Sequence, residues 1–168
     1  NSSRTSEVGV KADFSLRPAA GHHIRYGAAV QYHIYSPDYF SQLKATLLGK
    51  TIVEQELKET ETRNTAEPAV YVEDEIIFSD KLTANAGLRY AAIFTGDKTY
   101  HGIEPRAALR FSWTDNTSLK LSYSEMVQNS HLIASNYLQL PTSFWMPSTA
   151  KIAPSHSRQV SGGAYFRL

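Results

Sequence analysis

The chain has 168 residues, enough for one domain of ordinary size, and its 17 Lys and Arg residues nearly balance its 16 Asp and Glu residues. Neither a basic stripe nor an acidic tract is present, so nothing indicates nucleic-acid binding, and the absence of cysteine excludes disulfide bonds and cysteine-ligated metals. No apolar run approaches the roughly 18 residues that a membrane-spanning helix needs, and the start lacks the apolar core of a signal peptide.

The dominant pattern is an alternation of apolar and polar residues with a period of two. Such alternation predicts β-strands with one apolar face and one polar face. A segment around Leu43–Leu57 has some features of a short helix, but Thr51, Ile52 and Val53 favour a strand. The alternating runs, in chain order, are Val8–Leu16, Ile24–Ile34, Val70–Phe78, Leu82–Phe94, Pro105–Trp113, Leu119–Tyr123 and Val160–Leu168.

The links between these runs alternate in length. Short links lie at Arg17–Gly21, Ser79–Lys81 and Thr114–Ser118, and longer ones at Ser36–Glu67, Thr95–Gly102 and Val127–Ser157. In an up-and-down meander, alternate links fall at the same end of the sheet. Outer-membrane barrels combine short periplasmic turns with long extracellular loops, and about nine to eleven tilted residues cross the bilayer. We therefore predict an all-β fold, an antiparallel up-and-down meander of about seven long strands that is part of an outer-membrane β-barrel.

Alternation alone leaves open which face points outward. A soluble barrel buries its apolar face, whereas a membrane barrel turns that face to lipid. The polar positions include Gly9, Gly27, Gly87 and Gly163 among charged residues, which is typical of a lumen wall. The alternative is a self-contained soluble β-sheet module that binds a ligand.

Several segments resemble the barrel strands of TonB-dependent outer-membrane transporters, in that family's order and spacing. The strand segments are Tyr71–Glu75 (YVEDE), Leu82–Tyr90 (LTANAGLRY), Glu104–Arg110 (EPRAALR) and Ser122–Met126 (SYSEM). The loop segments Leu138–Thr142 and Trp145–Ser148 resemble a loop of Bacteroidetes-type members.

The resemblance implies a barrel of about 22 strands filled by an N-terminal plug domain and energised through TonB. It implies a location in the cell outer membrane, contact with outer-membrane lipid and import of a nutrient, which could be a metal chelate, a vitamin, a glycan or a peptide. Residues 1–168 would then be a partial β-barrel domain that lacks the plug domain, the TonB box and the remaining strands. Such a fragment has bare edge strands, so we expect it to self-associate or to curl with its apolar set inside.

The long link from Asn129 to Lys151 is the candidate ligand-binding loop. Exposed aromatic residues among amides and hydroxyls are typical of sites that capture sugars or amphipathic ligands. The alternative is that these side chains fold the loop against its own barrel. The residues in question are Tyr137, Phe144, Trp145 and Met146.

Other titratable groups give no catalytic, metal or cofactor site. His22 and His23 lack further ligands at a suitable spacing, and the other histidines are scattered over long links. Glu73, Asp74 and Glu75 alternate between opposite strand faces, which disfavours a catalytic pair, and no nucleophile elbow is present. The acidic residues Glu54, Glu56, Glu59 and Glu61 could form a cation-binding rim, but a solvated polar strand is the simpler interpretation.

The apolar faces of neighbouring strands must coincide, which fixes a register for the hairpin at Asp80. The polar face should then bring Tyr71 beside Arg89, with Glu73 diagonal to Arg89, as a structural cluster. Asp74 falls on the apolar face, where we expect it near a membrane interface or partnered by a hydroxyl or an amide. The predicted pairs on the apolar face are Val72 with Leu88, Ile76 with Ala84 and Phe78 with Leu82.

Overall fold

A computed structural model describes the backbone of residues 2–47, 50–59, 61–96, 98–135 and 142–167. Within those ranges the regular structure is all β, and no helix is long and apolar enough to cross a membrane. The strands are β1 (Ser2–Leu16), β2 (His22–Leu47), β3 (Lys50–Glu59), β4 (Arg63–Ser79), β5 (Leu82–Phe94), β6 (Thr99–Thr114), β7 (Thr117–Gln128), β8 (Ser130–Ser135), β9 (Thr142–Pro147) and β10 (Ser155–Phe166).

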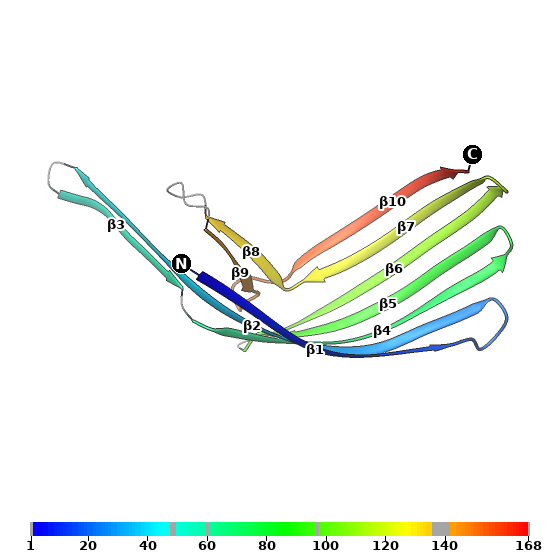
Figure 1. The fold of residues 1–168 in the computed structure, drawn as a ribbon, viewed down its shortest axis with the longest axis horizontal. Coiled ribbons are helices and arrows are strands. Elements are labelled where there is room, and N and C mark those ends of the chain that lie inside the picture. Colours follow the sequence, from blue (N-terminus) through cyan, green and yellow to red (C-terminus); the bar gives the residue numbers. More distant parts are fainter. Residues whose placement is uncertain (1, 48–49, 60, 97, 136–141, 168) are drawn as a thin grey trace.

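The main sheet is an antiparallel meander in the order β1-β2-β4-β5-β6-β7-β10 (Figure 1). These strands correspond to the seven alternating runs, so the predicted fold class is confirmed. The additional strands all lie within long links: β3 pairs with the distal part of β2, and β8 pairs with β9. The strand interpretation of the segment around Thr51 is therefore correct.

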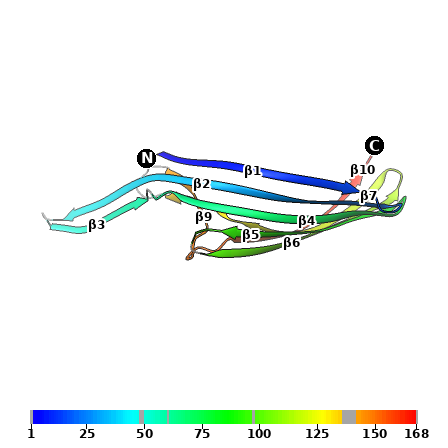
Figure 2. The same cartoon turned by 90° about the horizontal axis from the view of Figure 1, so that it is seen from below.

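The connections sort by length to the two ends of the sheet, as predicted. The turns β1–β2, β4–β5 and β6–β7 lie together at one end, which we call the turn end (Figure 1). The opposite end holds the link from β5 to β6, the β8–β9 hairpin, and the β2–β3 hairpin, which extends beyond the main sheet (Figure 2). We call this the loop end.

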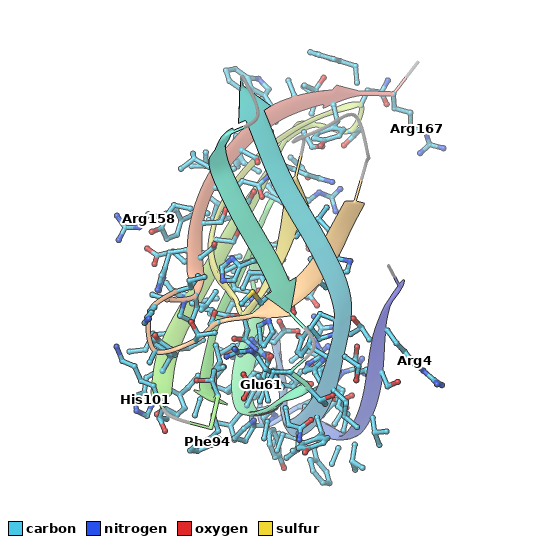
Figure 3. The ribbon with its side chains drawn as sticks, turned by 90° about the vertical axis from the view of Figure 1, so that its left-hand side faces the viewer. Arg4, Glu61, Phe94, His101, Arg158 and Arg167 are labelled. Atoms are coloured by element: carbon cyan, nitrogen blue, oxygen red, sulfur yellow. The ribbon has the colours of Figure 1, made fainter. Side chains whose placement is uncertain are left out.

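The sheet is curved, and its polar face is the concave one. Seen from the loop end, the strands arc around the β8–β9 hairpin, while His101 and Arg158 project away from the enclosed side (Figure 3). The apolar positions lie on the convex face and are open to solvent; Val10 and Val160 are 77% and 73% exposed. The apolar set has therefore not curled inward, and self-association stays a prediction.

The register of the β4–β5 hairpin confirms most of the predicted pairs. Val72 lies opposite Leu88, Ile76 opposite Ala84 and Tyr71 opposite Arg89. The pairing of Phe78 with Leu82 is wrong, because a bulge between Ile77 and Ser79 places Ser79 opposite Leu82.

A hydroxyl explains this shift. The backbone N–H groups of Lys81 and Leu82 donate to the Ser79 Oγ at 3.3 and 3.2 Å, which closes the turn on Ser79 and leaves Phe78 as the extra residue. The β6–β7 turn uses the same device: the Asn116 N–H donates to the Thr114 Oγ1 at 3.3 Å, and the register shifts just before Thr114.

Each hairpin tip of the main sheet is also tied to the next strand of the meander. In every case the donor is a backbone N–H near the end of that strand, and the acceptor is the carbonyl oxygen of the last turn residue. The bonds run from Ile77 to Gly21 at 2.7 Å, from Ser112 to Lys81 at 2.7 Å and from Arg167 to Asn116 at 2.8 Å.

Asp74 lies on the convex face near the turn end. Its Oδ2 pairs with the His22 Nδ1 at 2.7 Å, so its partner is an imidazole rather than the expected hydroxyl or amide. The cross-strand neighbours of Asp74 are Ile24 and Ala86, and its Oδ1 is buried without a hydrogen-bond partner.

We expect Asp74→Asn to be nearly neutral to folding, with a change in unfolding free energy within about 0.5 kcal/mol. An amide oxygen still accepts a hydrogen bond from His22, and the substitution removes a charge from an apolar face. The urea unfolding midpoint in detergent micelles measures this. A large loss of folded protein would show that the charge itself is needed.

Candidate ligand-binding site

The β8–β9 hairpin lies over the concave wall at the loop end (Figures 1 and 3). It follows β7 after a single residue, Asn129. Its second strand, β9, contacts β2 and β1 on the opposite side of the concave face. The long link therefore folds inward across the sheet.

Asn129 fastens the base of the hairpin to β4. It is 4% exposed. Its Nδ2 donates to the Glu67 Oε1 at 2.7 Å and to the Thr65 Oγ1 at 3.4 Å, while its Oδ1 accepts from the Ser148 N–H at 3.2 Å. One amide thus joins the two ends of the loop to the wall.

Further hydrogen bonds hold the hairpin on both sides. The Tyr35 hydroxyl on β2 lies 2.5 Å from the Ser130 Oγ, and the Tyr100 hydroxyl on β6 donates to the Thr149 carbonyl oxygen at 2.6 Å. Burial raises the pKa of the Tyr35 phenol above its ordinary value, although the Ser130 hydrogen bond lowers it in part. Tyr35 therefore stays a neutral hydrogen-bonding group.

A hollow of about 720 Å³ lies between this hairpin and the wall. Its floor holds His33, whose Nδ1 is 3.7 Å from the Glu7 carboxylate and whose Nε2 is 3.5 Å from the Glu67 carboxylate. The Gln31 side-chain amide donates to Glu7 at 3.1 Å, and Trp145 of β9 also lines the hollow. Amides, carboxylates and an aromatic ring around an open hollow favour binding of a polar ligand.

The structure describes the side chains of two of the four predicted loop residues, Trp145 and Met146. Trp145 is 44% exposed, and Met146 is half-buried opposite His131 of β8. The backbone of Phe144 pairs with Ile133, but its side chain lies outside the described residues, as does all of Tyr137. Their role in ligand binding stays a prediction.

Tyr71, Glu73 and Arg89 share the concave face, but each side chain bonds to a residue on a strand other than β4 and β5. The partners are, in that order, Asp13 on β1 at 2.5 Å, Arg25 on β2 at 2.7 Å and Glu104 on β6 at 2.8 Å. These contacts join β4 to β1 and β2 on one side, and β5 to β6 on the other.

Glu104 is a charged residue that the sequence analysis did not single out. It is 3% exposed and accepts from Arg89 at 2.8 Å and from the Val127 N–H at 3.4 Å, with Arg106 at 3.5 Å. Its position opposite Arg89 in the β5–β6 register is the signal that could have found it. Asn129 was missed as well, and no local pattern marks it.

The remaining titratable groups lie apart. The His101 ring stacks on Tyr90, and His131 bonds to Ser148 within the hairpin region. Glu61 pairs with Arg63 at 2.9 Å, whereas the side chains of Glu54, Glu56 and Glu59 lie outside the described residues. In the part of the chain that the structure describes, no three His, Asp or Glu side chains are arranged so that they could hold a metal ion.

Comparison with known proteins identifies the family to which the chain is similar. The model of the family described as "TonB dependent receptor-like, beta-barrel" matches residues 1–167. No curated protein matches the chain. The family match covers almost the whole sequence and agrees with the meander, the sorting of short and long connections, and the polar concave wall. The chain therefore belongs to the TonB-dependent receptor-like β-barrel family.

Proposed function

We propose that this chain forms part of the wall of an outer-membrane receptor that binds a nutrient and imports it. The resemblance of its loop segments to Bacteroidetes-type members supports membership of that branch of the family. The ligand is a metal chelate, a vitamin, a glycan or a peptide. The receptor works by binding and transport rather than by catalysis, without a cofactor.

One observation supports this proposal above the others: a hairpin folded inward borders an open hollow at the loop end, with polar side chains on its floor. A hollow of about 720 Å³ falls within the range of small-molecule sites, roughly 300–1,000 Å³. Trp145 offers an exposed ring at its edge, and the Glu7, His33 and Glu67 side chains offer a polar floor. A ligand entering from the loop end meets these groups before it meets the rest of the wall.

The convex face supports a position in lipid. Its large apolar side chains are exposed along the length of the sheet. Phe78 and Trp113, which sit at the bulges beside the tight turns, are 62% and 65% exposed, as in the aromatic belt at a membrane interface. A self-contained soluble module gains nothing from such a surface.

The edges of the sheet support the proposal that residues 1–168 are a partial barrel. Among the described residues, β1 pairs only with β2 and β10 pairs only with β7. Unpaired strand edges require partners, which in a barrel are the remaining strands. The complete receptor would also contain the plug domain and work with TonB, as the family implies.

We expect Trp145→Ala to weaken ligand binding by the complete receptor up to about tenfold, because an aromatic contact contributes about 0.5–1.5 kcal/mol. A ferric chelate, a corrinoid, an oligosaccharide and a peptide mixture serve as probes, measured by equilibrium binding to outer membranes. Trp113→Ala is the matched control, since Trp113 lies in the β6–β7 turn region far from the hollow.

Two results would contradict the proposed function. One is unchanged binding of the preferred probe by Trp145→Ala. The other is a clean monomer of the receptor in buffer without detergent, which would favour the soluble module.

A further inference from the structure

The floor of the hollow at the loop end carries two carboxylates from different strands. Glu7 of β1 lies directly opposite His33 of β2, and Glu67 of β4 lies opposite Gln31, two residues away along β2. All four side chains line the hollow of about 720 Å³. The Glu7 side chain is 52% exposed and that of Glu67 is 17% exposed, so a ligand in the hollow can reach both carboxylates.

The side chains around these carboxylates do not neutralise them. The Gln31 amide donates to Glu7 at 3.1 Å and the Asn129 amide donates to Glu67 at 2.7 Å, but both donors are uncharged. The His33 ring lies 3.7 and 3.5 Å from the two carboxylates, and a protonated imidazole would bring one positive charge to two negative ones. Since a carboxylate accepts up to about four hydrogen bonds, both retain capacity for further donors.

Arg89 is the only lysine or arginine among the described residues that line the hollow. Its guanidinium already donates to the Glu104 carboxylate at 2.8 Å, and Glu104 is 3% exposed. Even with Arg106, which lies 3.5 Å from Glu104, the acids of this region outnumber the arginines by three to two. An anionic ligand would therefore meet excess negative charge on the floor, whereas a cationic ligand would relieve it.

The ring of Trp145 adds a second feature that favours a cation. It reaches the hollow from β9 and is 44% exposed. The face of an indole ring carries partial negative charge and attracts ammonium and guanidinium groups. Ser155, Ser157 and Thr5 also line the hollow, and their hydroxyls can pair with the uncharged polar groups of a ligand.

We propose that the hollow selects a positively charged ligand, whose ammonium or guanidinium groups bind Glu7 and Glu67 and contact the ring of Trp145. This inference deepens the proposed function and rests on it, since it names the charge class of the nutrient. A basic peptide and a small polyamine share the chemistry. A ferric chelate with net negative charge does not fit this floor.

The test measures equilibrium binding of two matched probes to outer membranes that contain the complete receptor. One probe is trilysine amide, and the other is the same peptide with all its amino groups acetylated. We expect the acetylated peptide to bind at least about tenfold more weakly, because its groups form no charge-assisted hydrogen bonds. This comparison uses the native receptor and so does not depend on how any variant folds.

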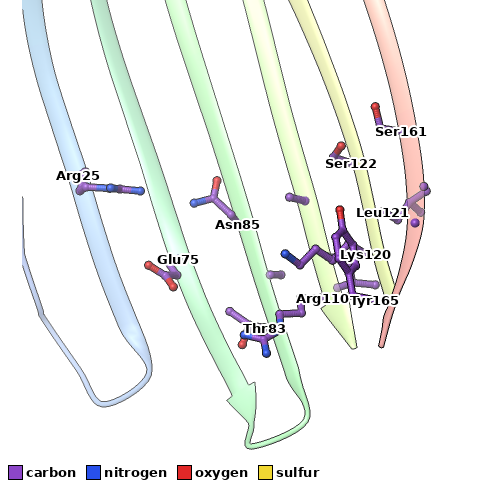
Figure 4. Close-up of a pocket in the computed structure, with 15 residues that line it drawn as sticks. Arg25, Glu75, Thr83, Asn85, Arg110, Lys120, Leu121, Ser122, Ser161 and Tyr165 are labelled. Carbon is purple, nitrogen blue, oxygen red and sulfur yellow. The ribbon is translucent and has the colours of Figure 1, made fainter. Parts of the chain in front are cut away.

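Glu7→Gln and Glu67→Gln should each weaken trilysine binding by about tenfold. The new amide oxygens can still accept from Gln31 and Asn129, so the floor keeps its hydrogen bonds and loses only charge. Glu75→Gln is the matched control: Glu75 lies on the same face of β4 near the turn end, where it lines a different hollow (Figure 4). Unchanged binding in this variant would show that the position of the lost charge matters.

Spermidine distinguishes the two sources of the ligand. Glu-dependent binding of spermidine as tight as that of trilysine would identify a polyamine, and a preference for trilysine would identify a basic peptide; either result supports the proposal.

The proposal is overturned if neither basic probe binds, if the acetylated peptide binds as tightly as trilysine, or if both Gln variants bind trilysine like the native receptor. Tight binding of an anionic ferric chelate that survives both Gln substitutions would also overturn it, while the proposed function would stand. Charge-dependent binding of trilysine by a receptor that imports no probe into cells would instead refute the proposed function alone.

Discussion

Replacing Asn129 by leucine is expected to release the β8–β9 hairpin from the concave wall. Leucine has a similar volume, but it loses the side-chain hydrogen bonds to Glu67, Thr65 and Ser148. At about 1 kcal/mol net for each, the docked hairpin loses roughly 3 kcal/mol, which shifts the opening equilibrium by about two orders of magnitude. Hydrogen exchange of the backbone amides in β8 and β9 measures the opening.

Asn64→Leu is the matched control for this experiment. Asn64 is exposed on β4, directly before Thr65, and lies opposite Ile34 in the register rather than beneath the hairpin. The same chemical change there should leave exchange in β8 and β9 unchanged. Equal protection of the hairpin in Asn129→Leu and the native chain would show that other contacts, such as that of Tyr35 with Ser130, hold it.

Gly27→Val is expected to destabilise the sheet by about 2–4 kcal/mol. A Cβ at Gly27 would lie 2.5 Å from the Ala12 carbonyl oxygen and 2.8 Å from both the Asp13 Oδ1 and the Tyr71 ring. Tyr71 passes over this residue to reach Asp13, so the added side chain also breaks the hydrogen bond between them. Backbone atoms cannot move aside without disturbing the β1–β2 pairing.

Gly9→Val tests whether the loss comes from this close approach or from replacing any glycine in the wall. Gly9 lies on the same face of the same strand pair, and the nearest atom to a Cβ there is the flexible Gln31 side chain at 3.4 Å. We expect it to be neutral or slightly stabilising, since valine favours strands. Urea unfolding of both variants in detergent, followed by tryptophan fluorescence, provides the comparison. Similar midpoints for the two would refute the steric argument.

The strand faces and most of the register could be predicted because alternation is a local property. Val72 and Leu88 lie opposite each other because both belong to continuous apolar faces, and a shift by one residue would turn one of them into the lumen. The exception at Phe78 arose from a turn hydroxyl. Ser79 caps its own turn through two backbone N–H groups, and this preference outweighs the continuation of the apolar pairing.

The candidate site was less predictable because its contacts join distant segments. Asn129 forms hydrogen bonds with Glu67 and Thr65 of β4 and with Ser148, which follows β9. The sequence around Asn129 does not predict these long-range contacts. The β8–β9 hairpin has strands of six residues each, too short for alternation to stand out within a long polar link. The aromatic content of that link did draw attention to Trp145, whose ring lines the hollow.

The bonds that tie each hairpin tip to the following strand of the main sheet make the wall modular. Every tip presents a carbonyl oxygen in the same position, and the strand that follows brings an N–H to it. Each unit of two strands and one turn therefore carries the same hydrogen bond at its turn, from an N–H of the following strand to the carbonyl oxygen of the last turn residue. Whole hairpins could be duplicated, deleted or exchanged between receptors without redesigning the junctions, so barrels of this kind can change circumference in steps of one hairpin. A change of a single strand would instead leave a tip without its donor.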